Sequence, residues 1–221
     1  MKVYLAVIDT LADWEIGYLV AELHSRRFFA NPLMDFAFLK VGLTVDPVTS
    51  MGGVTHEPDL ALADLVLEQG DVLVLPGGET WDQPETRPLL EFARDALDQG
   101  HYVAAICGAT DGLAAVGALD NRRHTSNNLD FLKQSCPAYR GEKLYRNEPA
   151  VRGDNLLTAT GLAPLEFTAE VLKMAKVWRP ETIRAWYQLH KTRKERWYHA
   201  LVASMTPPAA MEAAPRPDLQ A

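Results

Sequence analysis

Cysteine, long apolar runs and positive charge are all scarce in this sequence. Its 221 residues include two cysteines, Cys107 and Cys136, too few for a disulfide framework, which favours a reducing cytoplasm. No stretch approaches the ~18 apolar residues of a membrane span. The apolar run near the N-terminus has only about six residues and no small-residue cleavage site follows it, so we expect no secretion signal. The formal net charge of −7 argues against nucleic acid or a membrane as a partner.

Signals for cofactors are scarce as well. The six histidines, at positions 24, 56, 101, 124, 190 and 199, include no pair at metal-ligand spacing. Gly77 and Gly78 are not followed by the Lys-Ser/Thr of a phosphate loop, and there is no GxGxxG motif. We therefore expect neither a metal nor a nucleotide cofactor.

Short apolar runs alternate with longer amphipathic stretches along most of the chain. Strands separated by helices imply parallel pairing and a sheet covered on both faces, so we predict a doubly wound α/β fold with a mostly parallel sheet between helices. The expected strands are residues 2–8, 36–41, 71–75, 102–106, 142–151 and 155–158, and the expected helices are residues 14–27, 60–67, 84–98, 109–116 and 165–177.

The C-terminal part has a different character. Apolar and aromatic residues recur at helical spacing over residues 181–205 and predict one long additional helix. We expect an α/β domain over residues 1–178 and a helical extension over residues 179–205, packed on that domain or on a partner subunit. Residues 206–221 are rich in Pro and Ala and are expected to form a disordered tail. The basic run at residues 191–196 is interpreted as a solvated helix face.

The segment that could carry a reactive residue begins at the end of the strand at residues 102–106. It runs directly into Cys107, Gly108 and a small-residue helix, a pattern typical of a nucleophile elbow. A helix N-terminus lowers the pKa of a thiol from about 8.5 by roughly one unit. An alternative is that Cys107 is simply a buried core residue. The spacing alone leaves both interpretations open.

Four segments together resemble the ThiJ/PfpI superfamily. They are ADWEI at residues 12–16, LVLPGG at 73–78, AAICGAT at 104–110 and TATGLAPLEFT at 158–168. The resemblance runs in order over residues 1–177. It implies a flavodoxin-like fold of the class I glutamine amidotransferase type, related to intracellular proteases and amidases.

The resemblance also implies roles for individual residues. Cys107 is implied as the nucleophile, Glu15 as the carboxyl group bonded to it, and Gly78 and Gly108 as backbone donors to an oxyanion. A protonated Glu15 would lower the pKa of Cys107, so we expect a buried Glu15 with a raised pKa and a thiol that reacts below pH 7. The alternative for Glu15 is an acid in the first turn of a helix, favoured by the dipole.

The sequence departs from the superfamily pattern where a histidine is expected. Gly108 stands where protease-like members carry histidine after the cysteine. In the later RHTSN segment, His124 is a candidate proton-transfer residue, but the small polar pair at residues 125–126 aligns the expected partner position with Asn127. This departure weakens a peptidase interpretation, because cysteine nucleophiles usually rely on an adjacent base.

The function that we predict is a cysteine-dependent hydrolase, amidase-like or peptidase-like, or a carbonyl-detoxifying lyase, acting on a small carbonyl or amide substrate. The alternative is a non-catalytic redox sensor or stress-response protein that works through oxidation of Cys107. Trp14, Glu79 and Asn127 are candidates for the pocket wall, and Cys136 is expected to be inert. The superfamily resemblance implies a homodimer.

Overall fold

The computed structural model describes residues 1–205 and has at its centre a seven-stranded sheet in the order β5-β2-β1-β6-β7-β9-β8. Every neighbouring pair is parallel except β8 with β9. The predicted doubly wound, mostly parallel fold is confirmed. The expected tail, residues 206–221, lies outside the described residues. The strands are β1 (Lys2–Ala6), β2 (Ala37–Gly42), β5 (Leu60–Ala61), β6 (Val72–Leu75), β7 (Tyr102–Ile106), β8 (Ala150–Arg152) and β9 (Leu156–Ala159), with a separate hairpin of β3 (Val48–Thr49) and β4 (Thr55–His56).

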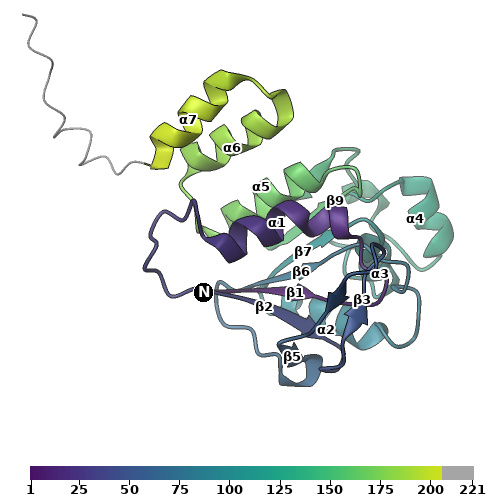
Figure 1. Cartoon of the computed structure of the whole chain (residues 1–221). Coiled ribbons are helices and arrows are strands. Elements are labelled where there is room, and N and C mark those ends of the chain that lie inside the picture. Colours follow the sequence, from purple (N-terminus) through teal and green to yellow (C-terminus); the bar gives the residue numbers. More distant parts are fainter. Residues whose placement is uncertain (206–221) are drawn as a thin grey trace, which may run out of the picture.

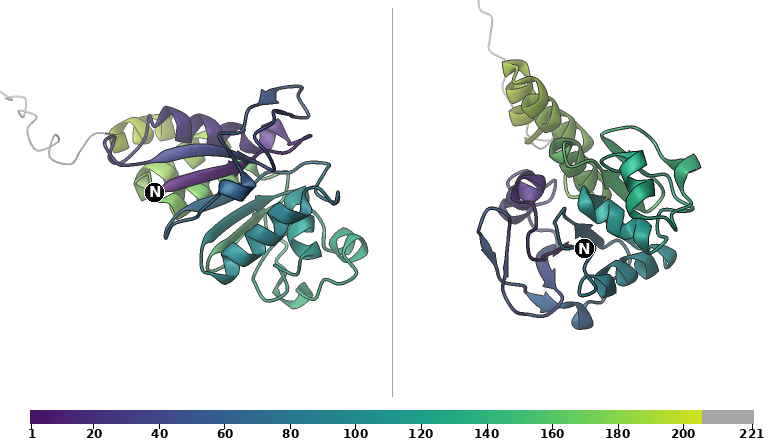
Figure 2. Two further views of the ribbon diagram at one scale, coloured as in Figure 1. Left: turned by 90° about the horizontal axis from the view of Figure 1, so that it is seen from below. Right: turned by 90° about the vertical axis from the view of Figure 1, so that its right-hand side faces the viewer.

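Helices cover both faces of the sheet (Figures 1 and 2). α1 (Asp13–Ser25) and α5 (Pro164–Ala175) pack together on one face, while α2 (Arg87–Asp98) and α3 (Gly108–Ala115) pack together on the other. Because both faces are covered, the central strands are apolar throughout, and all four residues of β6 are buried. A short helix that the sequence analysis missed, α4 (Leu129–Ser135), follows α3.

The order of the strands determines where a site can form. From β1 the chain first moves outward to β2 and then returns to the other side of β1 to form β6. Loops leaving the carboxyl ends of the strands on either side of such a reversal diverge, which opens a crevice at this edge of the sheet. Cys107 directly follows β7 at the same edge.

Two element predictions are wrong at the sheet edges. Residues 60–67 form strand β5 and a short 3-10 helix (Leu62–Asp64) in place of a helix, because Leu60 and Ala61 pair with β2. Residues 142–151, predicted as a strand, begin with a 3-10 helix (Glu142–Leu144), and pairing starts only at Ala150. In both places, contacts with the rest of the fold outweigh the local preference of the residues for a helix or a strand.

The predicted single C-terminal helix is divided into α6 (Pro180–Thr192) and α7 (Glu195–Met205). Arg193 between them has a left-handed backbone with φ 54°, which ends α6 and reverses the chain so that α7 lies against α6. α6 packs on the α/β domain of its own chain, where Trp186 is fully buried and donates its indole N–H to the buried Glu22 of α1 at 3.0 Å. None of the helices within residues 1–205 is long and apolar enough to cross a membrane.

Candidate functional site

Cys107 occupies the turn between β7 and α3 with φ 58° and ψ −127°. A residue with a side chain in this region stores strain on the order of 1–3 kcal/mol, a feature associated with functional sites. The turn is held by Thr110, whose N–H and hydroxyl donate to the Cys107 carbonyl at 2.9 and 2.6 Å. The thiol is half-buried and free. The predicted elbow is therefore present, and Cys107 is the N-cap residue of α3.

Glu15 lies in the first turn of α1 and is completely buried. Its Oε2 accepts a hydrogen bond from the Gly77 N–H at 2.7 Å. Its Oε1 is buried without a hydrogen-bond partner in residues 1–205, and both Oε1 and Sγ of Cys107 lie within about 3 Å of the position that a Cβ on Gly161 would take. The structure thus brings together the two residues that the resemblance paired. Glu15 also lies in the first turn of a helix, as the alternative interpretation expected, but its side chain is buried in the protein rather than exposed to solvent.

Two glycines make this close approach possible. A Cβ at position 77 would lie 2.4 Å from Oε2 of Glu15 and 2.8 Å from Cβ of Cys107. A Cβ at position 161 would lie 2.8 Å from the sulfur and 3.0 Å from Oε1 of Glu15. Real Cβ atoms essentially never approach other atoms this closely, so both loops need glycine for steric reasons.

Asn127 is the third group at the sulfur. Its side-chain Nδ2 donates to Sγ of Cys107 at 3.2 Å, and its Oδ1 accepts from the Gly161 N–H at 2.8 Å. The second bond fixes the orientation of the amide, because only the nitrogen end is left to face the sulfur. Asn127 therefore serves as a hydrogen-bond donor and has no proton to transfer.

His124 does not act at the sulfur, and the expectation that it transfers protons there is wrong. Its ring is fully buried, with Nδ1 at 2.7 Å from the Arg122 carbonyl and Nε2 at 2.6 Å from the Tyr139 hydroxyl. Residue 124 and residue 127 face different partners, as the alternation of side chains along an extended segment implies. His124 is a structural residue that ties residues 122–139 together.

An open hollow of about 710 Å³ lies beside Cys107. Trp14, a predicted wall residue, lines it with 57% of its side chain exposed, and Leu162 adds a second exposed apolar edge. The other lining residues come from α1, the segment between α3 and α4, the loop before β8, the loop that leads into α5 and α5 itself; they are Glu15, Asn127, Asn147, Glu148, Pro149, Thr160, Gly161, Ala163 and Glu166.

The predicted wall residue Glu79 does not line this hollow. It belongs with Gly78 and Gly108 to a neighbouring hollow of about 430 Å³ on α3. Gly78 and Gly108 pack closely, since a Cβ on Gly108 would lie 2.9 Å from the Gly78 carbonyl oxygen. The backbone N–H of Gly108 acts against the rise in the pKa of Cys107.

The carboxyl and thiol groups titrate as a pair. Burial raises the pKa of Glu15, as expected, although hydrogen bonds from Cys107 and Gly77 oppose this effect. Burial also raises the pKa of Cys107 to about 11; the Asn127 donor opposes the rise, and the negative charge of Glu15 adds to it. The direction of this shift is opposite to the one expected for a thiol that reacts below pH 7, and that expectation stays a prediction for the labelling experiments below. Once Glu15 is ionised, the pair holds one proton up to about pH 11.

Asn127→Ala is expected to raise the pKa of Cys107 further, because the variant removes the donor that stabilises the thiolate. One hydrogen bond to a charged group corresponds to about one pKa unit, so alkylation by iodoacetamide at pH 9 should slow by about tenfold. The measurement is a pH series of labelling in a Cys136→Ala background, where Cys107 is the only cysteine. An unchanged profile would show that the amide does not act on the sulfur.

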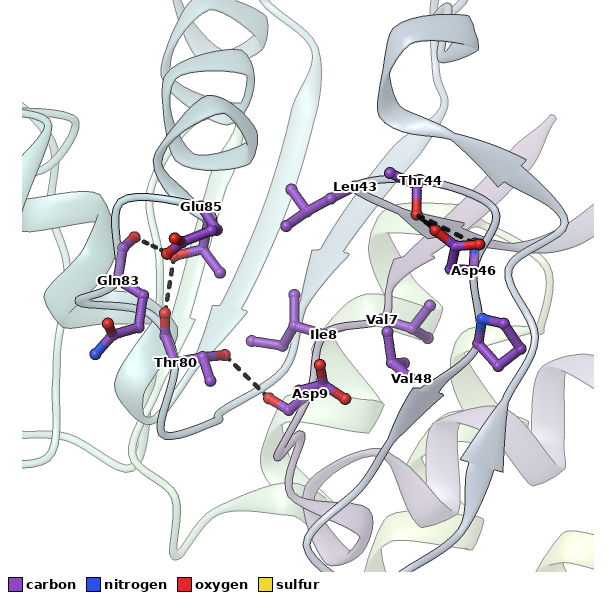
Figure 3. A pocket seen from close by; sticks show the side chains of 12 residues that line it. Val7, Ile8, Asp9, Leu43, Thr44, Asp46, Val48, Thr80, Gln83 and Glu85 are labelled. Atoms are coloured by element: carbon purple, nitrogen blue, oxygen red, sulfur yellow. Dashed lines mark hydrogen bonds between the residues drawn. The ribbon is translucent and has the colours of Figure 1, made fainter.

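A third hollow, of about 390 Å³, lies where β1 and β2 end (Figure 3). It is lined by carboxylates and hydroxyls over an apolar floor, and the Thr80 hydroxyl donates to the Asp9 carbonyl at 3.0 Å across it. None of its lining residues is a cysteine, histidine or lysine. In residues 1–205 no three His, Cys, Asp or Glu side chains are grouped so that they could hold a metal ion.

Gly77 and Gly161 are the functional residues that the sequence analysis missed. Both lie within the segments that carried the resemblance, but the resemblance implied a role only for Gly78 and Gly108, as backbone donors to an oxyanion. The sequence contains part of the signal, because a glycine in a loop that follows a strand often marks a place where another group approaches the backbone closely. Which group approaches is decided by α1, which is distant in sequence.

Comparisons with known proteins show the family and the fold. Residues 1–174 match the model of the DJ-1/PfpI family. The chain is 46% identical over 201 residues to a protein of Bacillus subtilis (strain 168) named "Uncharacterized protease YoaZ", covering 91% of this chain and 96% of the relative. It is 34% identical over 127 residues to "Deglycase PYRAB04690" of Pyrococcus abyssi, covering 57% of this chain and 72% of that protein.

A solved structure gives the same result for the fold. The crystal structure of a thiJ/pfpI family protein from Bacillus anthracis superimposes with a TM-score of 0.89 and 48% identity, covering 92% of this chain and 96% of the other. The family match spans most of the chain and includes β1, α1, β6, β7, α3 and β9, the elements that bring Glu15, Gly77, Cys107 and Gly161 together. This chain belongs to the DJ-1/PfpI family.

Proposed function

We propose that this protein is a cysteine-dependent hydrolase in which Cys107 attacks the carbonyl carbon of a small carbonyl or amide substrate. The observation that carries the proposal is the convergence of the Glu15 carboxyl group and the Asn127 amide on one half-buried sulfur at the wall of an open hollow. Relatives named protease and deglycase support hydrolytic chemistry at the level of the family.

Glu15 is the group that we assign to proton transfer. Because the thiol keeps its proton up to about pH 11, attack on a carbonyl requires that the proton leave the sulfur as the S–C bond forms. The Oε1 of Glu15 accepts that proton, and the carbonyl π electrons move to oxygen. The resulting carboxylic acid then protonates the new alkoxide, which gives a hemithioacetal, or the departing amine of an amide, which gives a thioester. Water hydrolyses the thioester and returns the proton to the sulfur.

Two further contacts support this chemistry. Gly108 directly follows Cys107 at the N-terminus of α3, and the Gly78 backbone packs beside it, so the N–H groups of Gly78 and Gly108 are our candidates for the oxyanion site. Asn127 orients the sulfur without acting as a base. Since Glu15 alone exchanges protons with the sulfur, we favour substrates whose reaction needs one proton carrier, such as reactive aldehydes and activated amides.

The raised pKa of Cys107 also weighs against the redox-sensor alternative. Oxidation begins from the thiolate, so a thiol with a pKa of about 11 reacts slowly with peroxide at neutral pH. The burial of the sulfur and the carboxyl group beside it thus favour the enzyme over the sensor.

Turnover of methylglyoxal and of a panel of peptide p-nitroanilides tests the proposal. Wild type and Cys136→Ala should consume at least one substrate, and Cys107→Ala should fall to background, a loss of about 10³-fold or more. Mass spectrometry of the wild type should trap a hemithioacetal or thioester on Cys107. The proposal fails if no substrate is turned over while mild peroxide adds two oxygens to Cys107.

A further inference from the structure

A chain of polar side chains runs from the backbone of Cys107 to the carboxyl group of Asp111 on α3. The Thr110 hydroxyl lies 2.6 Å from the carbonyl oxygen of Cys107 and 2.8 Å from the Ser126 hydroxyl. The Ser126 hydroxyl in turn lies 3.2 Å from Oδ1 of Asp111. Thr110 and Ser126 are completely buried, so their hydroxyl groups must find hydrogen-bond partners within the protein.

The number of protons in this chain depends on the state of Asp111. A hydroxyl group donates one proton, so Thr110 and Ser126 supply two protons for three contacts. The two contacts of Thr110 have the length of full O–H···O hydrogen bonds, and each needs a proton of its own. Thr110 then donates to Cys107 and Ser126 donates to Thr110, which leaves no proton for the contact with Asp111. All three contacts are satisfied together only when Asp111 is a carboxylic acid and brings the third proton.

The length of the third contact fits a neutral Asp111. A hydroxyl that donates to an ionised carboxylate lies at about 2.5–2.7 Å from it, whereas the Ser126 oxygen lies 3.2 Å from Oδ1. Ser126 therefore directs its proton to Thr110, and the carboxyl group is a weaker, uncharged partner.

The surroundings of Asp111 disfavour its ionised form. Asp111 lines the hollow of about 430 Å³ on α3 together with two other acidic side chains, Glu79 and Asp82, and with Cys136. The Cys136 thiol donates to the main-chain carbonyl of Asp111 at 3.3 Å. Within residues 1–205, no lysine, arginine or histidine lines this hollow, so no cation there holds the carboxyl group in its charged state. Burial raises the pKa of Asp111 to about 6, and the hydrogen bond from Ser126 opposes the rise.

We propose that Asp111 is a positioning residue whose neutral form holds the nucleophile elbow in place through Ser126 and Thr110. When Asp111 gives its proton to water, the Ser126 hydroxyl turns toward the carboxylate, and the single proton of Thr110 is left for two contacts. The carbonyl of Cys107, a residue with φ 58° and ψ −127°, is then held less firmly. This inference rests on the proposed function only in taking Cys107 as the nucleophile.

The direction of the effect follows from Asn127, which comes directly after Ser126 and donates to Sγ of Cys107 at 3.2 Å. A less firmly held elbow weakens this hydrogen bond, so the thiolate loses part of its stabilisation. Asp111, with its pKa raised to about 6, keeps its proton in mild acid and loses it toward neutral pH. Cys107 should therefore be better positioned in mild acid than at neutral pH.

The test is the rate at which N-ethylmaleimide labels Cys107 between pH 5 and pH 8 in wild type and in Asp111→Asn. The thiolate adds to the double bond of the reagent and the neighbouring carbon takes a proton from water, so the test needs no turnover. Labelling is read by mass spectrometry of the peptide that contains Cys107, with Cys136 left in place because it contacts Asp111. The amide of asparagine can donate to Ser126 at every pH. Taking the ratio of the two rates removes the titration of the thiol itself.

We expect the ratio of Asp111→Asn to wild type to be about one at pH 5 and to rise to about three at pH 8, half a pKa unit, with a midpoint near pH 6. In a Ser126→Ala background the same substitution should leave the ratio at one throughout, because the chain is broken while Asp111 still titrates. Thr110→Val breaks the chain at its other hydroxyl and serves the same purpose if Ser126→Ala does not fold. Asp82→Asn is the matched control, because Asp82 lines the same hollow but its carboxylate bonds to Gln83; its ratio to wild type should stay at one.

A ratio that does not change with pH overturns the inference. A step that survives in Ser126→Ala or Thr110→Val overturns it as well, because Asp111 would then act by its charge alone. Labelling reports on the position of Cys107 whether or not a substrate is turned over, so the proposed function can fail while this inference stands. Where a substrate is turned over, kcat should show the same step as labelling while KM stays constant.

Discussion

Replacing Glu15 with glutamine is expected to make Cys107 more reactive toward iodoacetamide while stopping turnover. The carboxylate raises the pKa of the thiol through its negative charge, and glutamine removes that charge. Burial, the largest cause, remains, so the pKa should fall by about one unit from about 11, which gives about tenfold more thiolate at pH 8. Turnover should fall by about 10²–10⁴-fold, because the proton carrier is lost.

This opposite movement of labelling and turnover identifies the role of Glu15, since a merely structural residue would lower both. The measurement pairs a pH series of iodoacetamide labelling with steady-state rates on the same substrate. Glu79→Gln is a suitable control, because that carboxylate lies outside the hollow at Cys107 and its removal should leave the labelling profile unchanged. A profile that moves to higher pH in Glu15→Gln would show instead that a protonated Glu15 donates to the thiolate, as the sequence analysis expects.

Gly161→Ala is expected to inactivate the site while leaving the fold intact. The new methyl group would lie 2.8 Å from Sγ of Cys107 and 3.0 Å from Oε1 of Glu15, so the sulfur, the carboxyl group or the loop must move. Movement of the loop would also break the 2.8 Å bond from the Gly161 N–H to Asn127. A displacement of about 1 Å in a reacting group costs on the order of 10²-fold in rate, and we expect a loss of at least that size.

The control for this variant is Gly153→Ala. Position 153 lies in the loop between β8 and β9, where the nearest atom to an added Cβ is 3.4 Å away, an ordinary contact. Circular dichroism and thermal unfolding should show both variants folded, so that a loss confined to Gly161→Ala reports on the site. Wild-type turnover in Gly161→Ala would mean that the sulfur and the carboxyl group need not meet.

Part of this site could be predicted from the sequence because it is encoded locally. An apolar strand that ends in Cys107 and Gly108 and leads into a small-residue helix specifies the elbow, and the structure places Cys107 there with φ 58°. The order of strands and helices likewise specifies a doubly wound sheet. The four motifs together predicted the family and the pairing of Glu15 with Cys107.

Other features depend on contacts that the sequence does not reveal. His124 and Asn127 are three residues apart and similar in polarity, yet only Asn127 reaches the sulfur, because Tyr139 and the Arg122 carbonyl engage both nitrogens of His124. The break at Arg193 was missed for a related reason, since the aromatic periodicity continues through it and the contact of α7 with α6 determines the turn.

By itself the sequence determined the fold, the family and the place of Cys107 on the elbow, because strand periodicity and the elbow are properties of neighbouring residues. Only the tertiary structure shows which groups surround the thiol. Folding buries the sulfur and brings Glu15 of α1 against Cys107 in the turn before α3; this burial and the charge of the carboxylate raise the pKa of the thiol to about 11, whereas the helix dipole would lower it.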